Sequence, residues 1–266
     1  MPPDLPVHAD QAQMVRVPPH GKKNFKLIIE YDGGQYHGWQ RQDGCATIQE
    51  TIENRISLMT GAPVTLIASG RTDAGVHALG QTANFHSDTS ISPDVLQKGL
   101  NSLLPDDIVI RKLEEVPAAF HARYDAKRKT YRYHFLNTPF PSAIGRKYHW
   151  HIRRPLDLGA MARAARFLAG AHDFKSFEGT GSPRSSTIRT VYESHIEEKP
   201  LGEITFTITA DGFLRFMVRN IVGTLALIGL GKLMPEEIEE IFLARDRRRA
   251  GNTAPAHGLF LMEVIY

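Results

Sequence analysis

The residues best suited to chemistry in this sequence are Asp73 and Arg71, two positions apart in the run Gly-Arg-Thr-Asp-Ala-Gly-Val-His at 70–77. A cation close to a carboxyl group lowers its pKa by about 1–3 units and keeps it ionised. An ionised aspartate can attack an electrophilic carbon. The sequence therefore predicts Asp73 as a nucleophile with Arg71 as its partner. The same residues also fit an ordinary turn, in which Asp73 bonds its own backbone and Gly75 takes a positive φ.

Six further short motifs lie before and after this loop. They read YDG at 31–33, GWQRQ at 38–42, FHAR at 120–123, YRY at 131–133, MVRNIVG at 217–223 and GLF at 258–260. With the run at 70–77, they closely resemble the tRNA pseudouridine synthase A family, whose signature is a GRTDAGVH loop that carries one catalytic aspartate. The resemblance covers residues 25–266 and leaves only the N-terminal tail outside it.

The resemblance implies a tRNA pseudouridine synthase, an isomerase that converts uridine to pseudouridine at positions 38, 39 and 40 of the anticodon stem-loop. It implies that Asp73 is the nucleophile, that Arg71 pairs with Asp73 and helps to displace the nucleotide, and that Tyr131 lies against the target uracil. It also implies a homodimer in which the tRNA contacts both subunits, with recognition by RNA shape instead of base sequence.

This isomerisation breaks the bond between N1 of uracil and C1′ of ribose and joins C5 to C1′ instead. Because nothing is oxidised or reduced and no external energy is needed, we expect no cofactor. An ionised aspartate can either add to C1′ or remove the 2′ proton to give a glycal, and the sequence leaves both routes open. We expect no metal either, because no ligand framework of known spacing surrounds His149 and His151.

Reaching a paired base requires flipping it out of the stack, at a cost of a few kcal/mol. Stacking on an aromatic ring returns about 1–3 kcal/mol per base. The resemblance gives this role to Tyr131. The alternative is that Tyr131 is an ordinary strand aromatic in the core.

Hydrophobic periodicity over the first half predicts strands and helices in the order βαββαβ. Apolar residues alternate over 25–31, as in a strand, and recur at helical spacing over 48–59, behind a capping box formed by Thr47 and Glu50. The remaining elements expected in this half are strands at 64–69, 81–87 and 108–116 and a helix at 93–103. This order is the ferredoxin-like pattern.

The second half repeats a related pattern, with strands expected at 129–136, 187–197, 204–210 and 259–266 and helices at 156–168, 213–230 and after Pro235. The sequence therefore predicts an α+β protein of two ferredoxin-like halves, 25–117 with the catalytic loop and 118–266 with Tyr131. Their mostly antiparallel sheets would lie side by side and form a central RNA-binding cleft. Asp73 would lie on a loop between two strands, and Tyr131 on the opening strand of the second half.

Basic residues are concentrated in segments suited to phosphate contacts, although the net charge is only +3. Five of them lie within 123–132, where Asp125 is the single acidic residue. Such a cluster with interleaved tyrosines fits RNA binding, and it equally fits a solvated face. Arg219 and Asn220 are polar residues in an apolar helix, so we expect them to face the cleft or a partner subunit. The predicted RNA contacts are Arg41, Arg123, Lys127, Arg128, Lys129, Arg132 and Arg219.

Composition bears on the location of the protein and on its N-terminus. A single cysteine, Cys45, allows no intrachain disulfide and indicates a reducing compartment. Residues 1–24 contain five prolines and lack the features of a signal peptide, so we expect a disordered tail. The longest apolar run, 221–230, falls short of the roughly 20 residues that cross a membrane, and predicts a buried helix. We therefore expect a cytoplasmic protein with no membrane contact.

Two other classes of protein remain compatible with these residues. A non-catalytic RNA-binding or chaperone protein would use the same basic surface without turnover. A hydrolase of nucleosides or sugars could use the same pair of Asp73 and Arg71, and it would release free uracil.

Overall fold

The protein, in a computed structural model, is described over residues 21–179, 181 and 185–266, where it forms ten strands and five α-helices. The strands are β1 (Lys23–Tyr31), β2 (Ile67–Ala68), β3 (His77–Ser87), β4 (Ile108–Val116), β5 (Arg128–Leu136), β6 (Trp150–His151), β7 (Gly170–Asp173), β8 (Ile188–Glu198), β9 (Glu203–Ala210) and β10 (Leu259–Ile265). The α-helices are α1 (Ile48–Thr60), α2 (Pro93–Leu103), α3 (Leu158–Phe167), α4 (Met217–Gly229) and α5 (Glu237–Ala244). Short 3-10 helices are η1 (Gly33–Gln35), η2 (Phe174–Phe177), η3 (Pro200–Gly202), η4 (Arg247–Arg249) and η5 (Ala256–Gly258).

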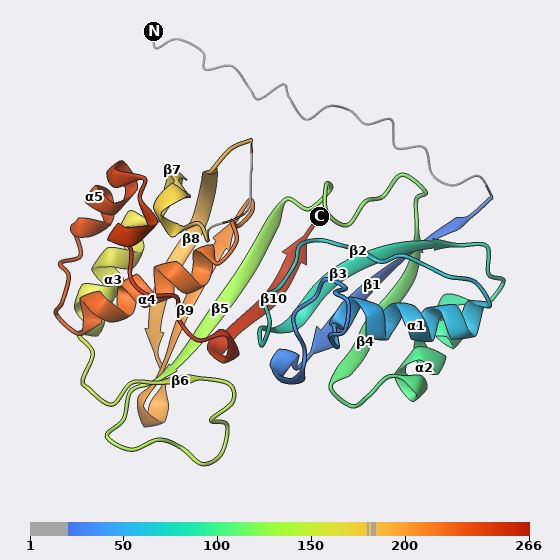
Figure 1. The fold of residues 1–266 in the computed structure, drawn as a ribbon, viewed down its shortest axis with the longest axis horizontal. Helices are drawn as coiled ribbons and strands as arrows, with labels where there is room; N and C mark the ends of the chain where they lie inside the picture. The colour runs from blue at the N-terminus through green and yellow to red at the C-terminus, as the bar shows by residue number, and fades with distance from the viewer. Residues whose placement is uncertain (1–20, 180, 182–184) are drawn as a thin grey trace, which may run out of the picture.

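The ten strands of the described residues belong to one sheet (Figure 1). Eight of them follow the order β4-β1-β3-β10-β5-β9-β8-β7, while β2 pairs with β3 and β6 pairs with β5. All neighbours are antiparallel except β10 with β3 and β5 with β6, which are parallel. The prediction of an α+β protein with mostly antiparallel strands is confirmed.

The last strand, β10, joins the two halves of the sheet. It pairs in parallel with β3, where Phe260 is opposite His77 and Leu261 is opposite Ala78, and antiparallel with β5. The two sheets expected side by side are therefore one continuous sheet, because a strand from the end of the chain fills the position between them. The boundary expected between residues 117 and 118 falls in the connection from β4 to β5, and it stays a prediction, as does the central cleft.

The first half has the predicted order β1, α1, β2, β3, α2 and β4. Alternate side chains of β1, namely Phe25, Leu27 and Ile29, are fully buried, as the periodicity predicts. Helix α1 is capped at its C-terminus by Gly61, whose φ of 74° is the left-handed conformation that favours glycine. The predicted capping box is wrong, because Thr47 stands at the N-cap with its hydroxyl buried and makes no capping hydrogen bond.

The second half keeps the predicted main strands and helices and adds two short strands, β6 and β7. Helix α4 begins at Met217, four residues later than predicted. The reason is Phe216, which has a φ of 60° in the left-handed region and so cannot continue a right-handed helix. In Figure 1, α1 and α2 lie beside the strands of the first half, while α3 packs on α4 and β8 in the second.

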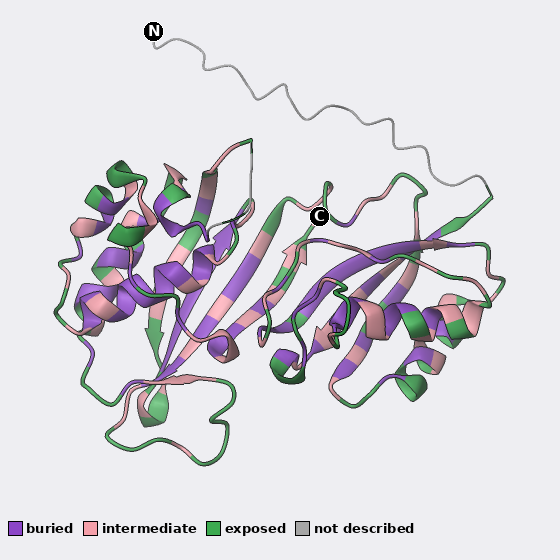
Figure 2. Cartoon of the chain, in the orientation of Figure 1, coloured by how far each residue is buried: buried purple, intermediate pink, exposed green. Residues whose placement is uncertain are grey.

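Most residues of β3, β9 and α4 are buried, whereas β7 and β8 together contain one buried residue, Val191 (Figure 2). The apolar run at 221–230 is thus a buried helix, as predicted, apart from its last residue, which caps α4. No helix of the described residues is long and apolar enough to span a membrane. Residues 1–20, most of the predicted tail, lie outside the described residues, whereas Lys23 and Asn24 belong to β1, so the tail prediction is wrong for these two.

The contact between β3 and β10 leaves no room for a side chain at Gly80. A Cβ atom there would lie 2.5 Å from the carbonyl oxygen of Met262 and 3.2 Å from the Cα of Glu263. We expect Gly80→Ala to lower the free energy of unfolding by about 1–3 kcal/mol, because backbone atoms of β10 must shift. Urea denaturation measures this change, with Gly212→Ala as the control, since its Cβ would meet no atom closer than 3.5 Å. Equal midpoints for the two variants would contradict the role given to this contact.

Candidate active site

Asp73 lies on the loop of residues 69–76 that connects β2 to β3, as predicted, and we call this segment the catalytic loop. Tyr131 lies on β5, the opening strand of the second half, also as predicted. The catalytic loop leads into His77, the residue of β3 that meets β10. Asp73 is therefore four residues away from the contact that joins the two halves.

The middle of the catalytic loop is held by residues of the first half. The hydroxyls of Tyr31 and Thr72 share a buried hydrogen bond of 2.8 Å, and the backbone N–H of Trp39 donates to the carbonyl of Thr72 at 3.1 Å. Gly38 has a φ of 95°, and a Cβ there would lie 2.7 Å from the same carbonyl. The segment after η1 thus approaches the backbone beside Asp73 more closely than any side chain would permit.

The end of the catalytic loop is linked to the second half through Asp32. The carboxylate of Asp32 lies 2.9 Å from Nδ1 of His77 and accepts a hydrogen bond of 2.8 Å from the hydroxyl of Tyr148. Tyr148 belongs to the connection between β5 and β6 in the second half. These contacts fix the point where the catalytic loop enters the sheet. No spacing in the sequence marks Asp32 or Tyr148 for this role, because the two residues are 116 positions apart.

Asp73 forms its ion pair with Arg219 of α4, not with Arg71. Nη1 of Arg219 donates to Oδ2 of Asp73 at 3.1 Å, and Nε of Arg219 donates to the carbonyl of Ala254 at 2.8 Å. Arg71 is exposed and makes no ion pair with any described residue. The predicted pairing of Arg71 with Asp73 is wrong because the Asp73 side chain meets the first turn of α4 and is only 26% exposed.

The pKa of Asp73 is raised above its ordinary value, opposite to the prediction. Burial of the carboxyl group is the largest cause, and the hydrogen bond and charge of Arg219, with the charge of Arg215, only partly offset it. The arginines therefore act against desolvation. They favour the ionised form that a nucleophile requires.

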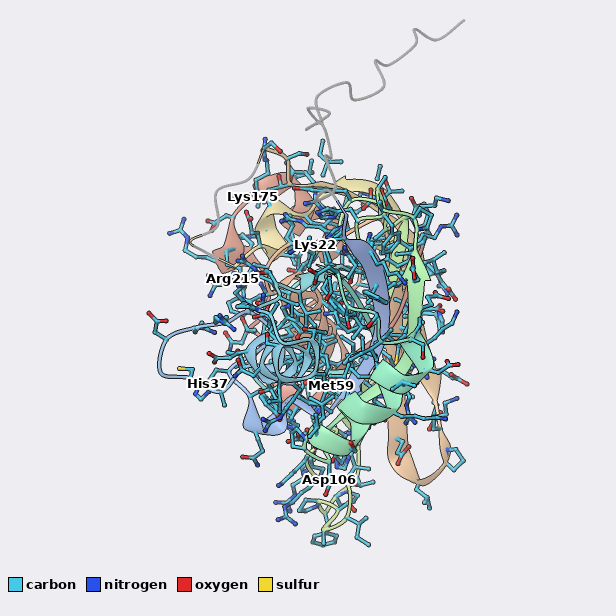
Figure 3. The ribbon with its side chains drawn as sticks, turned by 90° about the vertical axis from the view of Figure 1, so that its right-hand side faces the viewer. Lys22, His37, Met59, Asp106, Lys175 and Arg215 are labelled. Atoms are coloured by element: carbon cyan, nitrogen blue, oxygen red, sulfur yellow. The ribbon has the colours of Figure 1, made fainter. Side chains whose placement is uncertain are left out.

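Arg215 and Arg219 are arranged around the ring of Phe216. Their guanidinium carbons lie 4.7 Å and 5.2 Å from the ring centroid, within the range of cation–π contacts. In Figure 3, Arg215 lies toward the same side of the molecule as His37, which follows η1 in the first half. The left-handed Phe216 thus holds two cations near Asp73.

Tyr131 is buried, with 8% of its surface exposed, and its ring meets Phe213 edge to face at a centroid distance of 5.0 Å. Burial raises the pKa of the Tyr131 hydroxyl, and the negative charge of Asp73 contributes to the rise. The hydroxyl therefore stays protonated at neutral pH. The influence of Asp73 on Tyr131 indicates that the two predicted site residues lie in one neighbourhood.

The predicted RNA contacts fall into two groups. Arg123, Lys127 and Arg128 are exposed. Arg123 and Arg128 lie over the rings of Tyr124 and Tyr192, at 5.7 Å and 4.3 Å from the ring centroids. The other four make hydrogen bonds or ion pairs within the protein. Arg41 pairs with the buried Glu53 at 2.8 Å, Arg132 donates to Thr207 at 3.2 Å, Lys129 donates to the carbonyl of Ser69, and Arg219 binds Asp73.

Asn220 and Arg219 are neighbours with different roles. Asn220 is fully buried, donates to the carbonyl of Phe177 at 2.7 Å and accepts from Arg247 at 2.8 Å. The expectation that Asn220 faces the cleft or a partner subunit is therefore wrong, because its polar atoms are satisfied inside the second half. Arg219 was predicted to face the cleft or a partner subunit and to contact RNA. Its pairing with Asp73 was not predicted, although its charge within an apolar helix had marked it as a functional candidate.

The side chain of His151 contacts a backbone carbonyl, and His149 takes part in a contact through its own backbone carbonyl. Nε2 of His151 lies 2.8 Å from the carbonyl oxygen of Thr138, and Nε2 of His257 lies 3.1 Å from that of His149. Over the described ranges, no group of three His, Cys, Asp or Glu side chains could hold a metal ion. The groups that surround Asp73 are arginines and aromatic rings instead.

Sequence comparison with known proteins places this chain among the tRNA pseudouridine synthases. Residues 27–125 and 164–266 match the family model described as tRNA pseudouridine synthase, and the match includes Asp73 and Arg219 but not Tyr131. Proteins named tRNA pseudouridine synthase A from Acetivibrio thermocellus and Thermoanaerobacter sp. strain X514 are 50% and 48% identical over 244 residues, which are 92% of this chain and 100% of each relative. A protein named tRNA pseudouridine synthase A 2 from Clostridium perfringens is 44% identical with the same coverage. The chain therefore belongs to the tRNA pseudouridine synthase A family, a family of isomerases.

The ion pair predicts how activity depends on pH. Because Arg219 lowers the pKa of Asp73, Arg219→Met should raise that pKa and move the acid limb of the kcat/KM profile to higher pH, by about 1–3 units. Arg215→Met should move the limb less, because Arg215 acts on Asp73 through its charge without a hydrogen bond. The pH profiles of kcat/KM for both variants test whether the acid limb moves further in Arg219→Met than in Arg215→Met. An acid limb that stays in place without Arg219 would contradict it.

Proposed function

We propose that this chain isomerises uridine to pseudouridine at positions 38, 39 and 40 of the tRNA anticodon stem-loop, with Asp73 as the nucleophile. Membership of the family gives the enzyme class, a tRNA pseudouridine synthase. The observation that carries the role of Asp73 is its ion pair with Arg219, which favours an ionised carboxylate at a half-buried position between the two halves. The positions in the stem-loop rest on the motif resemblance.

The chemical steps of the reaction require one reactive group from the protein, the Asp73 carboxylate. The N1–C1′ bond breaks with its electron pair on the uracil, the uracil turns, and C5 forms the new bond to C1′ and then loses its proton. Asp73 either adds to C1′ and is later displaced, or takes the 2′ proton to give a glycal and later returns it. Both routes need the ionised form of Asp73 that the two arginines favour.

The nucleotide must leave the helical stack to meet Asp73, and we assign two residues to this step. Tyr131 stacks on the flipped uracil, which is consistent with its place near Asp73. Arg71 helps to displace the nucleotide. Its exposure supports this assignment, because its guanidinium is not engaged by Asp73 and is open to the RNA.

The exposed cations Arg123, Lys127 and Arg128 supply phosphate contacts in this proposal. The halves 25–117 and 118–266 form the two walls of the RNA site. A homodimer in which one tRNA contacts both subunits, and a cytoplasmic location, complete the proposal. These last two parts rest on the resemblance and on the single cysteine.

Removal of the Asp73 carboxylate tests the proposed nucleophile. We expect Asp73→Asn to lower the single-turnover rate on tRNA by about 10⁴-fold or more, with tRNA affinity retained, because only the attacking group is lost. Asp106→Asn is the matched control, since this exposed carboxylate lies far from Arg215 in Figure 3. Mapping of pseudouridine by chemical labelling measures both the rate and the modified positions.

Three outcomes of this experiment would overturn the proposal. An undiminished rate with Asp73→Asn removes the nucleophile. Unchanged cellular function of Asp73→Asn without any turnover indicates an RNA chaperone. Release of free uracil by the wild-type protein indicates a hydrolase.

The role of Tyr131 is tested by a pair of substitutions that separate its ring from its hydroxyl. Tyr131→Phe keeps the aromatic face and should keep kcat/KM within a few-fold of wild type. Tyr131→Leu loses base stacking of about 1–3 kcal/mol and should lower kcat/KM by about 5- to 150-fold. Thermal unfolding of both variants checks that the buried site remains folded. Equal activity of the two variants would contradict stacking on the uracil.

A further inference from the structure

Lys129 reaches from the second half of the protein to the start of the catalytic loop. It lies on β5 two residues before Tyr131, and the regular alternation of a strand puts both side chains on the same face. Its ammonium group donates a hydrogen bond to the carbonyl of Ser69, the first residue of the catalytic loop. One strand thus carries both the proposed stacking residue and a contact to the loop of Asp73.

Gly70 leaves the space that the Lys129 ammonium occupies. A Cβ atom at Gly70 would lie 3.1 Å from Nζ of Lys129, so a side chain there would press on the ammonium group. The first half holds the same two loop residues through Gln81, which accepts from the Ser69 hydroxyl at 2.7 Å and donates to the Gly70 carbonyl at 2.9 Å. The start of the catalytic loop is therefore tied to both halves.

No ion pair stabilises the charge of Lys129 among the described residues. No described carboxylate lies within 4 Å of its ammonium group, and Glu263 of β10 contacts the neighbouring Thr130 instead. Burial, together with the charges of Arg123 and Arg189, lowers the pKa of Lys129 to about 8. The hydrogen bond to the Ser69 carbonyl compensates in part for the cost of burying the charged ammonium group.

We propose that Lys129 is a positioning residue, which fixes the start of the catalytic loop to β5 and so sets Asp73 relative to the base held by Tyr131. This proposal rests on the proposed role of Asp73 as the nucleophile. It replaces the predicted phosphate contact of Lys129, because the ammonium group is already bonded within the protein. A displacement of about 1 Å at a reacting group lowers rates by about 100-fold. Loss of the hydrogen bond between Lys129 and Ser69 is therefore expected to lower the reaction rate strongly.

The first test compares Lys129→Met and Lys129→Arg with wild type. Lys129→Met should lower the single-turnover rate on saturating tRNA by about 10- to 100-fold, with the tRNA dissociation constant and its salt dependence unchanged. Lys129→Arg keeps a charged donor and should recover part of the rate. Lys98→Met, an exposed lysine of α2, is the matched control and should behave as wild type.

The pH profile supplies a readout that a purely structural role does not change. The free enzyme loses the charge of Lys129 above about pH 8. The pH profile of wild-type kcat/KM should therefore have an alkaline limb, along which activity falls around that pH. In Lys129→Met this limb should be absent, and in Lys129→Arg it should lie at higher pH. A limb that is the same in all three proteins would overturn the proposal.

A second outcome would also overturn it. If Lys129→Met weakens tRNA binding and reduces the salt slope by about 0.7–0.9 log units per log salt while the saturated rate stays normal, Lys129 is a phosphate ligand. If Lys129→Met does not fold, Gly70→Ala tests the same contact from the other side and should lower the saturated rate with unchanged tRNA binding. A normal rate in Gly70→Ala would then contradict the proposal.

The failure of this proposal is distinguishable from failure of the proposed function. Asp73→Asn alone decides whether Asp73 is the nucleophile. The Lys129 variants are compared with active wild type. If they behave as wild type while Asp73→Asn is inactive, the Lys129 proposal fails and the role of Asp73 stands.

Discussion

The ion pair between Asp73 and Arg219 is the interaction on which the site depends. It joins a loop of the first half to a helix of the second across 146 positions of sequence. Burial opposes the charge on Asp73, and Arg219 is the group that counters it directly. The site therefore exists only when the two halves are held together, which is the structural role of β10 between β3 and β5.

The backbone around Asp73 is fixed before any RNA arrives. Tyr31 and Trp39 hold Thr72, Asp32 lies against His77, and Lys129 reaches Ser69, so the catalytic loop is held at its start, middle and end. Such preorganisation lowers the reorganisation needed when charge develops in a reaction. In the proposed reaction the RNA moves and the loop does not, because the uridine leaves the stack to reach Asp73.

The periodic strands and helices of the fold were predictable from the sequence, and its nonlocal contacts were not. Alternation in β1 and the helical spacing of α1 depend on neighbouring residues, so the βαββαβ order of the first half could be predicted. The partner of Asp73 could not, because Arg71 is close in sequence whereas Arg219 is close only after folding. The continuous sheet was missed for the same reason, since β10 comes from the far end of the chain. The left-handed Phe216 and the buried Asn220 depend on packing that periodicity does not reveal.

The most direct test of the central claim is the titration of the Asp73 carboxyl carbon by NMR, with selectively labelled aspartate, in the wild-type protein and in Arg219→Met. The account predicts a pKa above 3.8 in the wild type, because burial outweighs the arginines, and a higher value once the Arg219 charge is removed. The same pKa in both proteins would show that Arg219 does not control the charge of Asp73, and would contradict the account.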